Sequence, residues 1–268
     1  MSDIVRTCHR GRVLEITFDR PPVNAINGVA SRALYAAFRE LRDDPALSVG
    51  LLTGTGERVF SAGWDLKEAA RAKGVEKTGP ESGHSPGGFA GNTEFWDLNK
   101  PLIAAVNGAA VGGGFELALA CDIIVAADHA WFELPEMQRG ILADAGALQR
   151  LPRRIPYNVA VELLLTGRRL EVEEAVRWGL VHKAVPLDRL MAEARALAQR
   201  VAEGAPLALQ AAKDLLTTTE SMPLSEAMAI AHPGKSGLES YERMANSEDA
   251  REGPRAFVEK RKPVWKGR

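Results

Sequence analysis

The sequence predicts an α/β protein with a helical C-terminal part, and three observations point to that class. Short apolar runs typical of buried strands alternate with helical patterns along the first half of the chain. Two glycine-rich turns, at residues 61–65 and 107–114, stand between strand-like and helix-like segments. After about residue 150 the apolar spacing is mostly that of helices. We therefore expect a layered strand–helix core, followed by helices whose apolar faces need a partner surface.

Alternating apolar and β-branched residues predict the first strands, over Val5–Cys8 and Val13–Phe18. Asn27 is a predicted helix N-cap, and the apolar residues from Ala30 to Leu41 have helical spacing. A short apolar run then predicts a buried strand over Val49–Leu52.

The central elements alternate in the same way. Composition predicts a mobile surface loop at residues 73–93, which contain six glycines and two prolines. A strand over Leu102–Val106 leads into the glycine-rich turn Asn107–Gly114, which is followed by helix Phe115–Ala120 and strand Ile123–Ala126. Further helices are predicted over 159–164, Leu187–Val201, Leu207–Leu216 and Ser247–Lys260.

Composition and charge exclude several classes of protein. The chain has 268 residues, of which 46% are hydrophobic and 26% charged, and its formal net charge is −1. These values are typical of a globular protein with a substantial core, and they argue against a nucleic-acid binder. No apolar run approaches the roughly 18 residues that span a bilayer, and the start of the chain lacks the apolar region of a signal peptide. We therefore expect a cytoplasmic protein without membrane contact.

Motifs of several common enzyme classes do not occur in the sequence. There is no H-E-x-x-H, no G-x-S-x-G and no Walker loop, which disfavours a metalloprotease, an elbow-type serine hydrolase and a P-loop NTPase. Cys8 and Cys121 are too few for a disulfide framework or a four-cysteine zinc site. The sequence therefore predicts no metal centre.

The glycine-rich turns are candidate sites for a negatively charged oxygen. Gly112, Gly113 and Gly114 precede a helix, so backbone N–H groups can approach a ligand where the helix adds partial positive charge. The turn Ser61–Asp65 also enters a helix, and one N–H from each turn could point at a shared oxygen, as in an oxyanion hole. Each turn alone could instead serve packing or chain connection. The G-x-G-x-x-G spacing of a dinucleotide site is absent.

Two glutamates are a candidate acid and base. Glu116 lies in a helix whose other residues are apolar, so we expect a buried side chain with a raised pKa. Glu136 follows Pro135 in a predicted loop, where an exposed glutamate is the commoner case, as for the neighbouring Glu133. Together, Glu116 and Glu136 would supply the acid and the base needed to add or remove water.

Taken together, these residues resemble the crotonase (enoyl-CoA hydratase/isomerase) superfamily over nearly the whole chain. No single segment is specific, but the ordered combination is. The matching segments are Phe60-Ser61-Ala62-Gly63, Asp65-Leu66-Lys67, Lys100-Pro101, Ala104-Ala105-Val106-Asn107-Gly108, Gly112–Ala118, Cys121-Asp122, Pro135-Glu136, Leu165–Arg168, Arg251-Glu252-Gly253 and Ala256–Arg261.

The resemblance implies a spiral of ββα repeats in residues 1–200, which hold an acyl-CoA site, and a C-terminal helical trimerisation region in residues 201–268. It also implies a homotrimer or a hexamer, an acyl-CoA thioester as substrate, and no cofactor besides the CoA that the substrate carries. Within the superfamily, Ser61–Lys67, Pro86–Gly91 and Pro263–Arg268 resemble the carnitinyl-CoA dehydratase branch, which adds water reversibly to crotonobetainyl-CoA.

The resemblance also assigns roles to residues. The backbone N–H groups of Trp64 and Gly113 would hold the thioester oxygen as it becomes an enolate. In the hydration direction Glu116 would activate water for attack on Cβ, and Glu136 would deliver a proton to Cα. Contacts to the substrate or its CoA are expected from Ala62, Asp65, Leu66, Lys67, Gly112, Asp144, Phe257 and Lys260, the last two often from a neighbouring subunit.

Two positions depart from the common family pattern. Pro22 stands where many hydratases have a lysine that contacts a phosphate, and Asp144 stands where a glycine normally helps to hold the catalytic water. The carnitinyl branch shares an aspartate here, and its substrate carries a quaternary ammonium. Such a cation prefers aromatic faces, or could meet the charge of Asp144. The aromatic candidates are Trp64, Phe89, Trp96 and Trp131, for each of which core packing is the commoner role.

Other functions stay open at the level of sequence. One is a generic short-chain enoyl-CoA hydratase, and another is an enoyl-CoA isomerase, which typically needs only the position of Glu136, so the presence of Glu116 favours a hydratase. Asp144 leaves room for a decarboxylase or a dehalogenase with the same oxyanion hole. The basic C-terminal residues, Lys260 and Arg261 among them, would fit a non-catalytic RNA-binding relative, although the net charge of −1 disfavours it.

Overall fold

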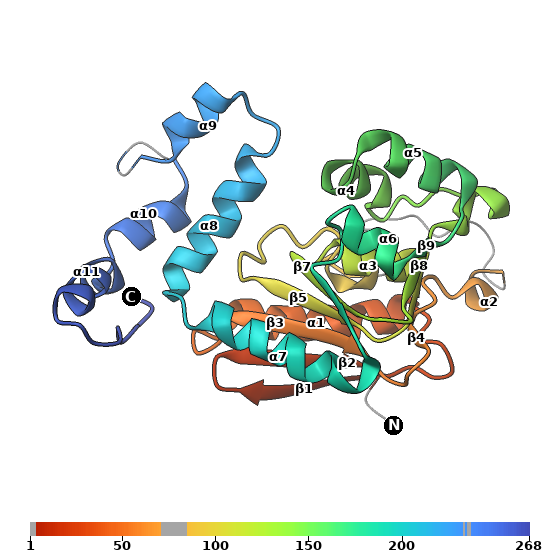
Figure 1. The fold of residues 1–268 in the computed structure, drawn as a ribbon, viewed down its shortest axis with the longest axis horizontal. Coiled ribbons are helices and arrows are strands. Elements are labelled where there is room, and N and C mark those ends of the chain that lie inside the picture. Colours follow the sequence, from red (N-terminus) through yellow and green to blue (C-terminus); the bar gives the residue numbers. More distant parts are fainter. Residues whose placement is uncertain (1–3, 71–84, 233, 235–236) are drawn as a thin grey trace.

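The computed structural model describes residues 4–70, 85–232, 234 and 237–268. Within them the chain forms an α/β core from which an arm of helices extends (Figure 1). Three times in succession, one strand joins a six-stranded sheet, the next strand joins a four-stranded sheet, and a helical segment follows. This arrangement confirms the predicted spiral of ββα units.

The six-stranded sheet has a parallel centre and an antiparallel edge. Its strands, in spatial order, are β1 (Val5–Arg10), β2 (Val13–Phe18), β3 (Val49–Gly54), β5 (Leu102–Val106), β7 (Ile123–Ala127) and β10 (Lys183–Val185). β1 and β2 form an antiparallel hairpin, and the other neighbouring pairs are parallel. Because β3, β5 and β7 are covered on both faces, they consist of nearly continuous apolar residues.

The four-stranded sheet positions the two glycine-rich turns. Its strands, in spatial order, are β4 (Val59–Ser61), β6 (Ala109–Val111), β8 (Trp131–Glu133) and β9 (Leu170–Glu171). β4, β6 and β8 are parallel, whereas β9 runs antiparallel to β8. The chain therefore leaves β4 and β6 at the same edge, which brings the two glycine-rich turns next to each other.

Helices cover the sheets and form the C-terminal arm. The α-helices are α1 (Gly28–Asp43), α2 (Leu66–Ala69), α3 (Gly113–Leu119), α4 (Ala147–Arg154), α5 (Tyr157–Thr166), α6 (Val172–Arg177), α7 (Leu187–Ala202), α8 (Pro206–Thr219), α9 (Leu224–Ile230), α10 (Glu239–Ala245) and α11 (Glu248–Val258), and the 3₁₀ helices are η1 (Phe89–Gly91) and η2 (Pro135–Arg139). Asn27 caps α1 as predicted, because its Oδ1 accepts a hydrogen bond from the Ala30 N–H at 2.9 Å.

Two predictions for the central part of the chain were wrong. The predicted mobile loop at 73–93 is instead largely buried over residues 85–93, while residues 73–84 lie outside the described residues. Its glycines allow close packing on α1, since a Cβ on Gly91 would collide with the backbone of Tyr35. In addition, the predicted turn Asn107–Gly114 contains strand β6, so the glycines belong to the start of α3.

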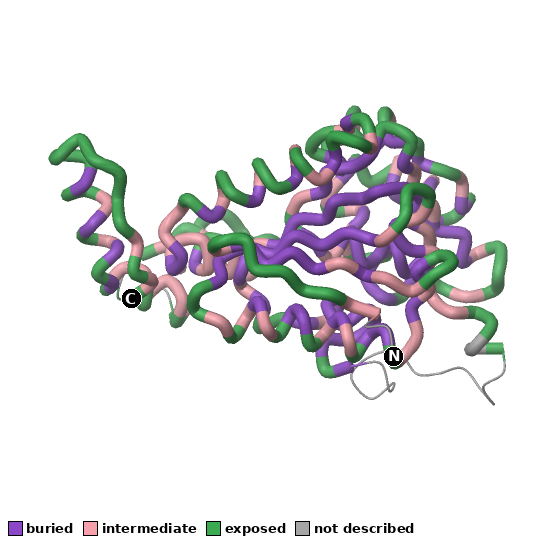
Figure 2. The backbone as a smooth tube through the Cα atoms, turned by 90° about the horizontal axis from the view of Figure 1, so that it is seen from below, coloured by how far each residue is buried: buried purple, intermediate pink, exposed green. Residues whose placement is uncertain are grey.

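Burial separates the core from the arm. The central strands are almost entirely buried, whereas the C-terminal helices are mostly exposed or intermediate (Figure 2). α7 packs across β3, β5 and β7, and α8 to α11 then extend away from the sheets (Figure 1). The predicted division at residue 200 falls near the end of α7 and stays a prediction. In the described part of the chain, no helix is long and apolar enough to cross a bilayer.

Candidate active site

The two predicted oxyanion-hole turns lie against each other. A Cβ built on Gly63 would come within 2.6 Å of the backbone nitrogen of Gly113, so the Cα of Gly63 lies beside that amide. Gly63 has φ +76°, a conformation that favours glycine, and Trp64 follows it directly. Gly113 is the first residue of α3, where backbone N–H groups have no intrahelical acceptor. The fold thus brings together the two turns that carry Trp64 and Gly113.

Glu116 is buried in α3 and held by the following turn. Its side chain belongs to a residue only 4% exposed, and its Oε1 accepts a hydrogen bond from the Ala147 N–H at 3.0 Å. Burial away from water raises its pKa to about 8, and the negative charges of Glu136 and Asp144 act in the same direction. The bond from Ala147 opposes this rise without cancelling it. The expected burial of Glu116 is therefore confirmed.

Glu136 is also buried, contrary to the usual expectation for a loop glutamate. It lies in η2, is 7% exposed, and its Oε1 would be 2.6 Å from a Cβ on Gly112. A side chain at position 112 would have to displace this carboxylate from its present place. Its Oε2 is buried and has no hydrogen-bond partner among the described residues. Burial raises the pKa of Glu136, and the charges of Asp144 and Glu133 add to that effect.

Gly112 connects the two carboxylates. It is the N-cap residue of α3, and its carbonyl oxygen accepts a hydrogen bond from the Glu116 N–H at 3.0 Å. Its own N–H donates to the Glu133 carbonyl at 2.8 Å, three residues before Glu136. Gly112 thus contacts the carboxylate of Glu136 and the main chain of Glu116, and it directly precedes Gly113. This arrangement can polarise a carbonyl and move two protons on neighbouring atoms.

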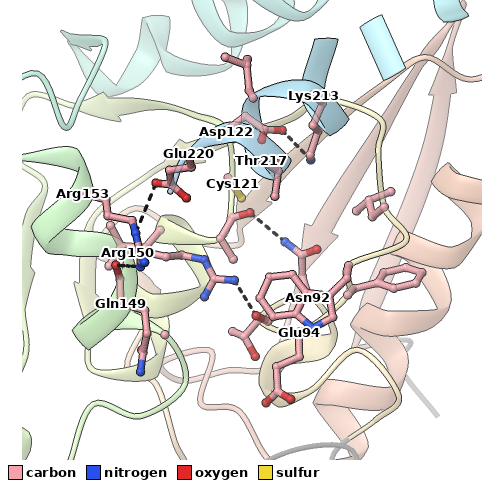
Figure 3. A pocket seen from close by; sticks show the side chains of 18 of the residues that line it. Asn92, Glu94, Cys121, Asp122, Gln149, Arg150, Arg153, Lys213, Thr217 and Glu220 are labelled. Atoms are coloured by element: carbon pink, nitrogen blue, oxygen red, sulfur yellow. Dashed lines mark hydrogen bonds and ion pairs between the residues drawn. The ribbon is translucent and has the colours of Figure 1, made fainter. Parts of the chain in front are cut away.

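A cavity of about 1,080 Å³ is lined by residues 144–146, which directly precede Ala147, and by residues of α8, whereas Glu116 and Glu136 do not line it (Figure 3). Asp144 and Trp96 line it together with a set of charged side chains. Arg150 donates to the Thr93 carbonyl at 2.6 Å, and Lys213 of α8 donates to Asp122 at 2.8 Å. The cavity therefore continues from the turn of Asp144 toward the helical arm. Among the described residues, no three His, Cys, Asp or Glu side chains are arranged to hold a metal ion.

Residues 9–268 match the family described as enoyl-CoA hydratase/isomerase. The chain belongs to this family. Over its full length it is 50% identical to a carnitinyl-CoA dehydratase from Salmonella typhi, which it also covers completely. An enoyl-CoA hydratase structure from Mycobacterium tuberculosis H37Rv is 40% identical with a TM-score of 0.87, and a carnitinyl-CoA hydratase structure from Mycobacterium avium is 38% identical with a TM-score of 0.75; each alignment covers both chains completely.

The other residues that we predicted to bind substrate or CoA form two groups, one near Gly63 and Gly113 and one far from them. Ala62, Asp65, Leu66 and Lys67 lie in the turn after β4 and at the start of α2, and Lys67 is exposed. Phe257, at the end of α11, is 85% exposed, and Lys260 follows it. Figure 1 shows α11 at the far end of the arm, away from α2 and α3. Within one chain, Phe257 and Lys260 therefore lie away from the two glycine-rich turns and from Glu116.

The aromatic candidates differ in their surroundings. Phe89 is buried, and its ring lies where a Cβ on Gly113 would stand. Trp131 is covered by the guanidinium of Arg169, which lies 3.7 Å from the ring centre. Trp96 is 72% exposed at the cavity. The guanidinium of Arg150, which also lines the cavity, lies 5.7 Å from the centre of the Trp96 ring.

Sequence reasoning missed residues that act through backbone atoms. The amide of Ala147 holds Glu116, and Ile26 bonds to the backbone on both sides of Trp64. Asn24 supports the same turn, since its Nδ2 donates to the Phe60 carbonyl at 3.1 Å. A backbone donor leaves no side-chain signature in a sequence. Asn24, two residues after a diproline, was the one side chain that could have drawn attention.

Proposed function

We propose that this chain adds water reversibly to enoyl-CoA thioesters, with crotonobetainyl-CoA and carnitinyl-CoA as the preferred pair. The observation that supports it most is that Glu116 and Glu136 are both buried and close enough for the charge of Glu136 to act on Glu116, near Gly112 and the amide of Gly113. An isomerase needs one such carboxylate, whereas adding water across a double bond needs a group for each of two protons. The family relationship and the 50% identity to a carnitinyl-CoA dehydratase favour the same reaction.

The proposed reaction assigns each group one task. Glu116, ionised, takes a proton from water while the oxygen bonds to Cβ. The electron pair of the double bond moves toward the thioester oxygen, where the N–H groups of Trp64 and Gly113 stabilise the enolate. Glu136, protonated, then delivers its proton to Cα. The proton gained by Glu116 returns to Glu136, which restores the starting state. Raised pKa values suit this pair, because one member must carry a proton near neutral pH.

Asp144 is our candidate for recognising the cationic acyl group. It lines the cavity together with Trp96, and its charge is close enough to influence both catalytic carboxylates. A quaternary ammonium has no N–H to donate, so it is recognised by negative charge and by aromatic faces. Asp144 and the exposed Trp96 ring line one cavity, in which the guanidinium of Arg150 lies 5.7 Å from the ring centre and would have to share or leave that face.

We further propose that the CoA site is completed in a homotrimer or in a hexamer of two trimers. In one chain, Phe257 and Lys260 stand at the far end of the arm. The arm also exposes large apolar side chains that a subunit contact would cover, namely Leu216, Leu224, Met228, Phe257 and Val258. Lys67 and the backbone of Ala62, Asp65, Leu66 and Gly112 would supply the contacts from the first chain. No separate cofactor is expected, since CoA arrives with the substrate.

The decisive experiment compares two substrates. Purified protein is incubated with crotonyl-CoA and with crotonobetainyl-CoA, and the loss of the enoyl thioester absorbance is followed. We expect both to be hydrated, the cationic one with the higher kcat/KM. Equal rates would leave a generic enoyl-CoA hydratase, and a shift of the double bond without hydration would indicate an isomerase. No turnover, together with a salt-dependent mobility shift of RNA, would indicate a binding protein instead.

A further inference from the structure

A short segment before α1 braces the turn that carries Trp64. Residues 20–26 run alongside residues 61–65 and bond to them through the main chain, and Ile26 and Trp64 form a parallel bridge. The three backbone hydrogen bonds are Ala62 N–H to Val23 O at 3.0 Å, Ile26 N–H to Gly63 O at 2.7 Å and Asp65 N–H to Ile26 O at 2.9 Å. The backbone of the turn is therefore held by hydrogen bonds on both sides of Trp64.

This brace fixes the direction of one amide. The Gly63 carbonyl accepts from the Ile26 N–H, which sets the plane of the peptide that joins Gly63 to Trp64. That peptide is trans, so its N–H points opposite to its carbonyl. The Trp64 N–H must then point away from Ile26. The Gly113 amide lies beside Gly63, and the proposed thioester oxygen would bind near these two amides.

The side chain of Arg20 links the brace to the turn that carries Trp64. Its Nη1 donates to the Ala25 carbonyl at 2.8 Å, and its Nη2 donates to Oδ2 of Asp65 at 2.7 Å. The side chains of Arg20 and Asp65 are 26% and 16% exposed, so this ion pair is shielded from solvent more than a surface pair. Asp65 follows Trp64 directly. Any change at this pair therefore acts on the peptide next to the Trp64 amide.

We propose that Arg20 and Asp65 are positioning residues that aim the Trp64 N–H at the thioester oxygen. This inference rests on the proposed oxyanion hole and deepens it. Because the two terminal nitrogens of Arg20 donate to Ala25 of the brace and to Asp65 of the turn, its geometry favours this role over a contact to a CoA phosphate. An oxyanion-hole donor is effective only when it is held in place before the charge develops. The pair supplies that rigidity without touching the reacting atoms.

The test measures carbonyl polarisation directly, without turnover. Butyryl-CoA, labelled with ¹³C at the thioester carbon, has no double bond to hydrate, and its bound C=O stretch reports the strength of the oxyanion hole. We expect the wild type to lower this stretch, and Arg20→Ala and Asp65→Asn to lose much of the lowering. Their dissociation constants for butyryl-CoA should change by no more than about threefold. The kcat for crotonyl-CoA should fall about tenfold to a hundredfold, as expected for a misplaced donor.

Two controls separate positioning from general damage. Arg195→Ala breaks a partly buried ion pair with Glu15, 2.7 Å long, between α7 and β2, and should leave the stretch unchanged. The double variant Arg20→Ala/Asp65→Asn should lose no more than either single variant, since both remove one link. Should Arg20→Ala fail to fold, Asp65→Asn carries the test, because it keeps the size of the side chain.

The outcomes are distinguishable from those of the proposed function. A wild type without a lowered stretch, or variants that keep the full wild-type shift, would overturn the positioning role. A fall in kcat with an unchanged stretch would also overturn it. A wild type that lowers the stretch but hydrates no enoyl-CoA would contradict the proposed function, while the loss of the shift in the variants would still support the positioning role.

Discussion

The backbone N–H of Ala147 donates a hydrogen bond to Oε1 of Glu116 across 3.0 Å, so the first residue of α4 holds the carboxylate that α3 supplies. Two helices that are separate in sequence thereby share one functional group. The bond fixes the direction of a carboxylate that burial would otherwise favour only in its neutral form. Glu116 can therefore exist in both protonation states at one position, which an acid–base group requires.

Replacing either glutamate should remove catalysis but not binding. We expect Glu116→Gln and Glu136→Gln to lower the kcat for hydration about 10²–10⁴-fold, because each removes one proton transfer. Affinity for butyryl-CoA should stay near the wild-type value, since glutamine has the same shape. Absorbance kinetics and calorimetry measure the two quantities. Full turnover in either variant would exclude that glutamate from the reaction.

The pH dependence of kcat/KM should be bell-shaped. The active pair carries one proton, so activity is lost when both carboxyls are protonated and again when both are ionised. Since the pKa of Glu116 is raised to about 8, the alkaline limb should fall near that pH. Hydration and dehydration should share one profile, because their ratio of kcat/KM is a pH-independent equilibrium constant. A kcat/KM that stays constant from neutral pH to well above pH 8 would contradict a shared proton.

The raised pKa of Glu116 also predicts how the stability of the fold depends on pH. The pKa of Glu116 rises from 4.5 to about 8 on folding, so the folded state holds a proton that the unfolded chain releases. Its contribution to stability is full below the unfolded pKa and is lost as pH rises toward about 8. We expect Glu116→Gln to gain Tm over the wild type between about pH 5 and pH 8, by roughly 3–8 °C. The exposed Glu226→Gln should show no such gain.

Gly63 should tolerate no side chain. Its φ of +76° disfavours alanine, and a Cβ would stand 2.5 Å from the Val111 carbonyl oxygen as well as against the Gly113 amide. We expect Gly63→Ala to lose at least about a hundredfold in kcat, as for loss of an oxyanion donor. Gly179→Ala is the matched control, because Gly179 has the same φ but open space around it. It should lose some Tm and keep its kcat. Equal losses of activity in both would disprove a local effect.

Asp144 should decide between cationic and neutral acyl groups. We expect Asp144→Asn to lower kcat/KM for crotonobetainyl-CoA about tenfold more than for crotonyl-CoA, because only the former carries a charge to attract. The ratio is the measured quantity, since Asp144 also influences Glu116 and Glu136 and could change both rates equally. A ratio that matches the wild type would remove Asp144 from substrate recognition.

Much of the fold could be predicted from local patterns. The strand Val13–Phe18, the cap at Asn27 and the helix from Leu187 have clear periodicity or stop signals, and the structure has them there. The segment 85–93 could not be predicted, because its glycines were interpreted as flexibility. They instead allow the backbone to pack closely on α1, and composition alone does not distinguish these two uses.

The candidate site was predictable to the extent that side chains carry it. Glu116 stood out because a charged residue among apolar helical neighbours must be buried and specially supported. Glu136 had no such local signal; its carboxylate lies against Gly112, which is distant in sequence and close in space. Glu116 is supported by a backbone group of Ala147, and the Trp64 turn by backbone groups of Ile26; the side chains of these two residues give no indication of that task.

The position of the helical arm determines how active an isolated subunit can be. Since Phe257 and Lys260 lie far from the glutamates of their own chain, a solitary subunit would hold only part of the coenzyme's binding surface. Specific activity would then decline on dilution. Two variants with low activity, one altered at Glu116 and the other at Lys260, should regain partial turnover when they are mixed and exchange subunits. Some of the mixed assemblies would contain a site with both residues intact.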